Sequence, residues 1–300
     1  MLVMFLCIVI GFIANKKKLV PKDTATALSK LENYFLVPAL ILNTFMSYCT
    51  VQSITEYYDC IIFCIITIAM AIPIAYLGAP IFDRSEALRP IYRYALTFGN
   101  FGFMGNAIVP AIMGEEFLYP YMLFTLPLNF ICYTWGVMGL MPKGNKNVLK
   151  TLVNPTVISI AVGSALGLLG VTKYVPGFIM TTIKNLAACM GPVAMILTGH
   201  VIGDYKITGL LKMPKVYIAT FIRLFLLPAV YIAVLWLLKA DRNIMFFCLF
   251  AYATPLGLNT IIYPAAYGGD THTGASMAMI SHTVCVITIP IVYAILNMLV

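Results

Sequence analysis

The stretch FGNFGFMGNAIVPAIMGEE, residues 98–116, lies within an apolar run that is long enough to cross a membrane. It nevertheless contains four glycines, two asparagines and a proline. Glycine and proline weaken helices, and side-chain amides are costly to place in hydrocarbon. A helix that only anchors a chain has no use for these residues, so the stretch predicts an interrupted helix with another role.

The composition indicates an integral membrane protein. Of the 300 residues, 61% are hydrophobic and 10% are charged, whereas soluble domains carry about 25% charged residues. Apolar runs of about 20 residues, the length needed to cross a bilayer as a helix, recur along the chain. We therefore expect an all-α polytopic membrane protein with ten transmembrane helices. The expected spans are 1–14, 31–49, 60–81, 94–113, 118–141, 153–171, 180–203, 216–238, 244–267 and 274–299.

The first apolar run is short, so a cleaved secretory signal is the alternative to a membrane span. A signal peptide carries its positive charge before the apolar run, whereas Lys16, Lys17 and Lys18 follow this one. We therefore expect a helix that stays in the membrane.

The positive charges predict the orientation in the cell membrane. With both termini placed outside, fourteen lysines and arginines fall in inner loops and only four, Lys173, Lys184, Lys239 and Arg242, fall in outer loops. Basic residues favour the cytoplasmic side, which predicts that the N-terminus and the C-terminus are both outside. The net charge of +8 therefore indicates topology, and we expect no nucleic-acid partner.

The chain contains an internal repeat. A shift of 154 residues places 98–116 on YATPLGLNTIIYPAAYGGD, residues 252–270, so that Pro110 falls on Pro264 and Gly114 on Gly268. Each unit holds five crossings, an odd number, so the second unit enters the membrane from the opposite side. We expect two inverted five-helix repeats, residues 1–141 and 151–300, joined by a short cytoplasmic linker at 142–150, with the fourth and ninth spans broken.

Inverted repeats with a broken span in corresponding positions are typical of secondary transporters and mark their binding sites. Broken helices expose unpaired N–H groups, which favour anions, and such backbone is tolerated in a membrane only where it faces a cavity or protein. Tight helix packing is the alternative role for the glycines. The candidate substrate-binding residues are Asn100, Gly102, Gly105, Asn106, Pro110, Pro255, Gly257, Asn259 and Thr260.

Two ionisable residues inside spans are candidates for proton or anion handling. His282 lies deep in the tenth span, where a neutral, hydrogen-bonded histidine is the alternative. Arg223 lies about two turns inside the eighth span, and we expect it to extend to the cytoplasmic face, with anion handling as the alternative. All eleven acidic residues, Glu32 among them, are expected in loops or at helix ends, so the coupling ion, H⁺ or Na⁺, stays open.

Motifs for chemistry are absent from the sequence. It has no phosphate-binding P-loop, no H-E-x-x-H pair and no G-x-S-x-G turn. We therefore expect no enzyme, no cofactor and no metal site. The eight cysteines are expected to pack as small apolar residues. A membrane sensor that binds a ligand without transporting it is the alternative function.

Several stretches resemble the auxin efflux carrier family: NYFLVPALIL (33–42), GNFGFMGNAIVPAIMGE (99–115), GPVAMILTGHVIG (191–203) and TPLGLNTIIYPAAYGGD (254–270). This family includes bacterial malate and malonate permeases and the plant PIN-FORMED auxin exporters, within the bile acid, arsenite and riboflavin transporter superfamily. By this resemblance Asn100 is similar to the family's crossover asparagine and Pro255 to its crossover proline. Two residues depart from the family's pattern: Gly99 stands where plant members often carry proline, and Ala107 stands where a proline is common in the Gly-x-Pro of this helix.

The resemblance implies an elevator-type transporter for a small carboxylate, such as malate, malonate or an auxin-like acid. It further implies a homodimer in which spans 1, 2, 6 and 7 form a scaffold and spans 3–5 and 8–10 form a moving core. The short 142–150 segment resembles that of bacterial-type permeases.

Overall fold

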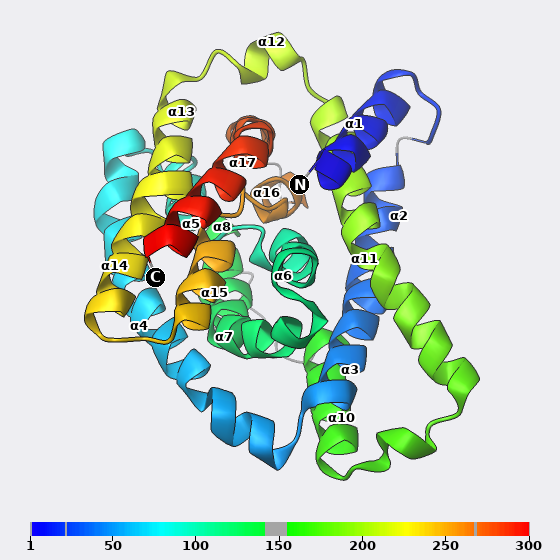
Figure 1. The fold of residues 1–300 in the computed structure, drawn as a ribbon. Coiled ribbons are helices and arrows are strands. Elements are labelled where there is room, and N and C mark those ends of the chain that lie inside the picture. The colour runs from blue at the N-terminus through cyan, green and yellow to red at the C-terminus, as the bar shows by residue number, and fades with distance from the viewer. Residues whose placement is uncertain (1, 22, 142–154, 267–268, 300) are drawn as a thin grey trace.

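The computed structural model describes residues 2–21, 23–141, 155–266 and 269–299, and every regular element in these ranges is a helix (Figure 1). The expected linker at 142–150 lies outside the described residues. This arrangement agrees with the expected all-α class.

The first half of the chain forms five helical segments. They are α1 (Leu2–Lys16), the continuous rod α2 (Thr24–Leu31), η1 (Glu32–Leu36) and α3 (Val37–Tyr48), then α4 (Val51–Phe82), the interrupted rod α5 (Arg89–Thr97), η2 (Phe101–Gly105) and α6 (Asn106–Met113), and finally η3 (Glu115–Phe117), α7 (Leu118–Ile131), η4 (Cys132–Gly136) and α8 (Val137–Leu140).

The second half has a similar series with two short helices, η5 and α12, added. It comprises α10 (Pro155–Leu168), η5 (Val171–Tyr174), α11 (Gly177–Gly203), α12 (Ile207–Leu210), the rod α13 (Pro214–Phe221), η6 (Ile222–Leu226) and α14 (Leu227–Leu237), the interrupted pair α15 (Arg242–Tyr252) and α16 (Asn259–Ala266), and α17 (His272–Leu299).

Six of these rods are long and apolar enough to cross a membrane: 51–82, 89–113, 115–140, 177–203, 214–237 and 272–299. Three shorter apolar helices, α1, α10 and α15, accompany them. A multi-pass membrane protein follows from these lengths. Each of the ten expected spans contains helix where the chain is described, although several helices begin earlier than expected.

The largest shift is in α4, which begins at Val51 rather than near residue 60. A capping box fixes this start: the Ser53 backbone N–H donates to Thr50 Oγ1 at 3.0 Å, and the Thr50 backbone N–H donates to Ser53 Oγ at 2.9 Å. Both N–H groups lack helical partners, so this reciprocal bonding stabilises the first turn. The predicted boundary missed it because the prediction followed apolar residues alone.

Glu32 is a second departure from expectation, since it lies inside a helix and not at a helix end. The rod that contains it already begins at Thr24. The Glu32 side chain is completely buried, and neither carboxylate oxygen has a hydrogen-bond partner among the described residues. The expectation that every acidic residue lies in a loop or at a helix end was therefore wrong for Glu32, and also for Glu56 and Asp59, which lie inside α4 (Val51–Phe82).

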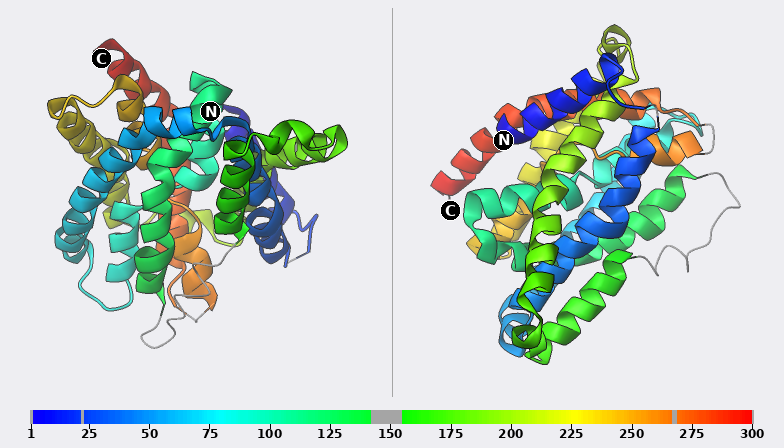
Figure 2. Two further views of the ribbon diagram at one scale, coloured as in Figure 1. Left: turned by 90° about the horizontal axis from the view of Figure 1, so that it is seen from below. Right: turned by 90° about the vertical axis from the view of Figure 1, so that its right-hand side faces the viewer.

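The helices form two groups. In one group α1 packs along α11, and α3 packs against both α10 and α11. In the other group α4 packs against α5 and α7, α14 against α15, and α13 against α17. Figure 1 shows α3, α10 and α11 on one side of the molecule and α4, α13 and α14 on the other, with α6 between them. The side view in Figure 2 shows α3 beside α11.

The first group is held by direct backbone contact. A Cβ atom on Gly199 of α11 would lie only 1.8 Å from the carbonyl oxygen of Ile8 in α1. Only glycine permits this approach, and close backbone contact between helices is a main source of packing energy in membranes. The pair α1 and α11 is therefore in direct backbone contact at Gly199.

Candidate functional site

Both expected helix interruptions are present. The first rod stops at Thr97, Phe98 is extended (φ −118°, ψ 138°), and helix resumes at Phe101. In the second rod α15 ends at Tyr252 and α16 begins at Asn259. The glycines, prolines and amides at these two places predicted the breaks because they are poor helix formers.

The two broken segments cross in contact with each other. The Asn100 backbone N–H donates to the carbonyl oxygen of Pro255 at 2.7 Å. A Cβ atom on Gly257 would lie 3.7 Å from the Gly99 carbonyl oxygen, so the two backbones are close here as well. Pro255 thus contributes its carbonyl group to the crossing, which we call the crossover (residues 98–100 and 253–258).

Asn100 sits at the centre of the crossover. It is 4% exposed, and its carbonyl oxygen accepts hydrogen bonds from the backbone N–H groups of Met104 and Gly105. Its side-chain Nδ2 lies 3.4 Å from Nε2 of His282, and Nδ1 of His282 lies 2.7 Å from the Ala278 carbonyl oxygen. The structure therefore brings together two residues that the sequence proposed separately.

A small cavity of about 60 Å³ adjoins the crossover. Predicted residues from both broken rods line it: Asn100, Gly102, Asn106, Gly257 and Asn259. Asn259 donates from Nδ2 to the Tyr94 hydroxyl at 2.7 Å. Because η2 and α16 begin beside this cavity, the positive ends of their helix dipoles lie there, an arrangement that favours anions.

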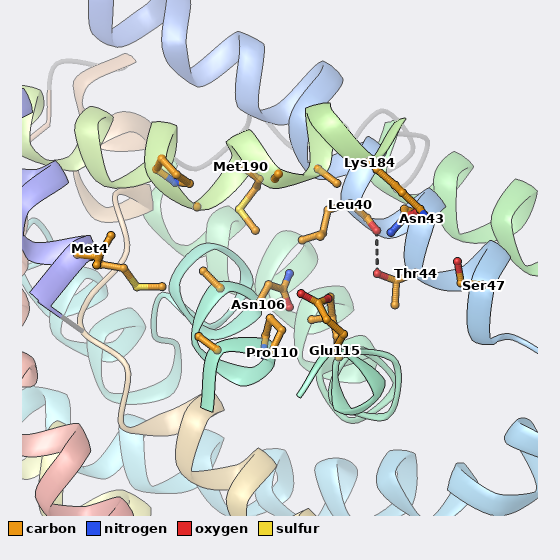
Figure 3. A pocket seen from close by; sticks show the side chains of 18 of the residues that line it. Met4, Leu40, Asn43, Thr44, Ser47, Asn106, Pro110, Glu115, Lys184 and Met190 are labelled. Atoms are coloured by element: carbon orange, nitrogen blue, oxygen red, sulfur yellow. Dashed lines mark hydrogen bonds between the residues drawn. The ribbon is translucent and has the colours of Figure 1, made fainter. Parts of the chain in front are cut away.

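A larger cavity of about 720 Å³ lies between the two helix groups (Figure 3). One wall comes from α1, α3 and α11, and the opposite wall from α6 and η3. Figure 3 shows Asn43, Thr44 and Ser47 on α3 and Asn106 and Pro110 on α6, with Lys184 and Glu115 also in the lining. Asn106 lines both cavities, so it lies between them.

Two amides in the larger cavity have unused hydrogen-bonding capacity. The Oδ1 atoms of Asn43 and Asn106 are buried, and neither has a hydrogen-bond partner in the described part of the chain. A buried amide without a partner costs free energy, so such groups are usually paired with a ligand or water. The cavity can therefore supply polar partners to a small solute.

Arg223 corrects an expectation, because it does not extend to the cytoplasmic face. It is 4% exposed, and its guanidinium donates from Nη1 to the carbonyl oxygen of Ala95 and from Nη2 to that of Thr254, the latter at 3.0 Å. Ala95 lies in the last turn of α5, and Thr254 follows α15. The partial negative charge at these helix ends attracts the cation inward.

Gly99 makes room for this arginine. A Cβ atom at Gly99 would lie 2.1 Å from Arg223 Nη2 and 2.5 Å from Thr254 Oγ1. Arg223 is outside the described lining of both cavities. Its hydrogen bonds therefore connect the two broken rods at a place outside the lining of the two cavities.

Two predicted site residues face neighbouring helices rather than the cavities. A Cβ atom at Gly105 would lie 2.0 Å from the Tyr121 hydroxyl oxygen, so this glycine permits close packing against α7. Thr260 is fully buried and lies 3.4 Å from the Gly257 carbonyl oxygen, with Gly274 of α17 packed against its backbone. The contacts of Gly105 and Thr260 therefore correspond to tight helix packing, which was the alternative role for the glycines in the sequence analysis.

Sequence reasoning missed several lining residues. Asn43 and Asn129 are amides in apolar runs, so the argument that selected Asn100 could have found them. Tyr94 and Cys132 reach the small cavity only through the tertiary fold, and no sequence signal marks them. Glu115 and Lys184 were considered only as charges near the membrane surface.

Comparison with known proteins supplies a further finding. The family model described as "Membrane transport protein" (Mem_trans) matches the chain in two segments, residues 1–149 and 144–293. Each matched segment contains one of the two interrupted rods. The search of curated proteins gave no match.

Proposed function

Because this chain belongs to the membrane transport protein family, which comprises carriers of the auxin efflux type, we propose that it is a secondary active transporter of a small organic anion. The single observation that carries the proposal is the crossover of two broken rods at a cavity lined by amides. The helix N-termini beside this cavity favour a carboxylate, although the described lining of the small cavity contains no lysine or arginine.

The proposed substrate is a small carboxylate, with malate or malonate ahead of an auxin-like acid. Polar groups on both walls of the larger cavity support this order, among them Asn43, Thr44, Ser47 and Asn106. Its described lining includes one aromatic side chain, Tyr48, so few aromatic contacts are available to an aromatic acid.

The proposed mechanism is elevator-like alternating access. The group of α1, α2–α3, α10 and α11 would be the scaffold, and α4–α8 with α13–α17 would be the moving core. If both termini are outside, the larger cavity, which Glu115 and Lys184 line, would face the outside. The smaller cavity, which Asn33 and Thr156 line, would face the cytoplasm. Asn106 separates the two cavities, as alternating access requires.

The inverted organisation is part of the same proposal. Residues 1–141 and 151–300 would be repeats of opposite orientation, and the scaffold would form a homodimer in the cell membrane. The similar order of rods in the two halves, each with one interruption, supports this arrangement.

Uptake of labelled malate into proteoliposomes tests the proposal. We expect saturable uptake by the wild type and loss of most uptake in the double variant Asn100→Ala, Asn259→Ala. The matched control is Asn185→Ala, Asn297→Ala, at two exposed amides, which should transport normally. Unchanged uptake in the crossover variant would contradict the site, and saturable binding without uptake would favour a sensor instead of a transporter.

A further inference from the structure

The contacts of His282 define its proton positions. Nδ1 lies 2.7 Å from the carbonyl oxygen of Ala278, which only accepts hydrogen bonds, so Nδ1 must carry a proton. In a neutral ring Nε2 then has none and can only accept. It lies 3.4 Å from Asn100 Nδ2, which donates to it.

This tautomer also orients the Asn100 side chain. Nδ2 is engaged by His282, so Oδ1 points the other way, 3.9 Å from the position of a Cβ atom on Gly257. Asn100 and Gly257 both line the small cavity. While His282 is neutral, the central amide therefore presents an acceptor oxygen beside the cavity, and an acceptor repels a carboxylate.

We infer that His282 Nε2 is the binding site of a coupling proton, and that its protonation turns the Asn100 amide into a hydrogen-bond donor for the carboxylate. This inference rests on the proposed function. The incoming proton can bind only at Nε2, which then donates and requires an acceptor. Rotation of the Asn100 side-chain amide lets Oδ1 accept a hydrogen bond from His282 Nε2 and turns the Nδ2 protons toward the cavity. In this rotation hydrogen bonds are exchanged and no covalent bond changes.

The surroundings of His282 favour binding of proton and anion together. Among the described residues, the charged group that acts on His282 is Arg223 of η6, and titratable neighbours are Tyr217 of α13 and Cys285 on its own helix. From α1, α11 and α12 the facing side chains are apolar, namely Ile8, Ile202 and Ile207.

Two further helices, α15 and α16, pack against α17, the helix that contains His282. α16 carries no charged residue, and α15 carries Arg242, which is hydrogen-bonded to Asn297 far along α17. The fixed charge of Arg223 opposes a second positive charge at His282 when the site is empty. A bound carboxylate offsets that opposition. By linkage, the proton strengthens anion binding by the same factor as the anion strengthens proton binding.

Calorimetric titration of the purified protein with L-malate tests the coupling. It is done in two buffers of different ionisation enthalpy, slightly above neutral pH, where malate is fully ionised. The wild type should take up about one proton per malate bound, and its affinity should fall about tenfold per pH unit in this range. His282→Gln should bind malate more weakly and take up no proton. His272→Gln, at the exposed start of the same helix, is the matched control and should behave as the wild type.

The outcomes separate this inference from the proposed function. Two results would overturn the inference while leaving anion transport intact. One is malate binding by the wild type without proton uptake. The other is proton uptake by His282→Gln equal to that of the wild type. Absence of both binding and flux would overturn the two together. If His282→Gln does not fold, the proton uptake and the pH dependence of the wild type decide the question alone.

Discussion

Arg223 shows how a single charged residue can be accommodated inside an apolar helix bundle. Its guanidinium contacts two carbonyl oxygens, those of Ala95 and Thr254, which lie at the C-terminal ends of the two helices that enter the crossover. Such ends carry partial negative charge, so the arginine is paired without any carboxylate. One side chain therefore fixes the position of both broken rods.

Replacement of Arg223 by glutamine should destabilise the protein. It removes the charge and leaves carbonyl oxygens unpaired in a buried place, at a cost of about 1–3 kcal/mol for each unsatisfied group. The measurement is the thermal unfolding midpoint of the purified protein in detergent. Arg242→Gln is the matched control, since Arg242 is exposed and bonded to Asn297. Equal midpoints for the two variants would show that the buried hydrogen bonds of Arg223 do not contribute measurably to the stability of the protein.

At the scale of helices, local composition predicted where the rods break but not what surrounds the breaks. Gly99, Asn100, Pro255 and Gly257 are poor helix formers, and the chain is irregular at these positions. The partners of Arg223 and the burial of Glu32 depend instead on contacts between segments distant in sequence, which no local pattern contains. The pairing of Asn100 with His282, 182 residues apart, is of the same kind.

The contact between α1 and α11 gives a prediction for a whole helix pair. Gly199→Ala places a methyl group where only 1.8 Å separates it from the Ile8 carbonyl oxygen, so the helices must move apart. Overpacking of this kind costs about 1–3 kcal/mol. The unfolding midpoint should fall clearly below that of Gly177→Ala, because Gly177 on the same helix has open space around it. A midpoint equal to that of the control would argue against close packing of α1 on α11.

At the scale of the molecule, two groups of helices enclose the larger cavity between them. The contact of α11 with α6 is one of the places where they meet, and a Cβ atom on Gly191 would lie 3.1 Å from Cβ of Ala107. If the core moves against the scaffold, this contact must open during each transport cycle.

A cross-link at this contact should stop transport. In a variant with Ala107→Cys and Gly191→Cys, and with the exposed Cys189 replaced by serine, the two Cβ atoms are close enough for a disulfide after slight relaxation. We expect malate uptake to fall by about tenfold or more on oxidation and to recover on reduction. The single variant Gly191→Cys is the control for oxidation itself. Full uptake by the quantitatively cross-linked protein would exclude movement at this contact.

The most direct test of the account is an experimental structure of the protein with malate bound at saturating concentration. The account predicts ligand density beside the crossover, with its carboxylate within hydrogen-bond distance of the Asn100 or Asn106 side chain and of the first N–H groups of η2 or α16. Density for malate at another place, or a protein that binds malate while either rod runs unbroken through the membrane, would contradict it.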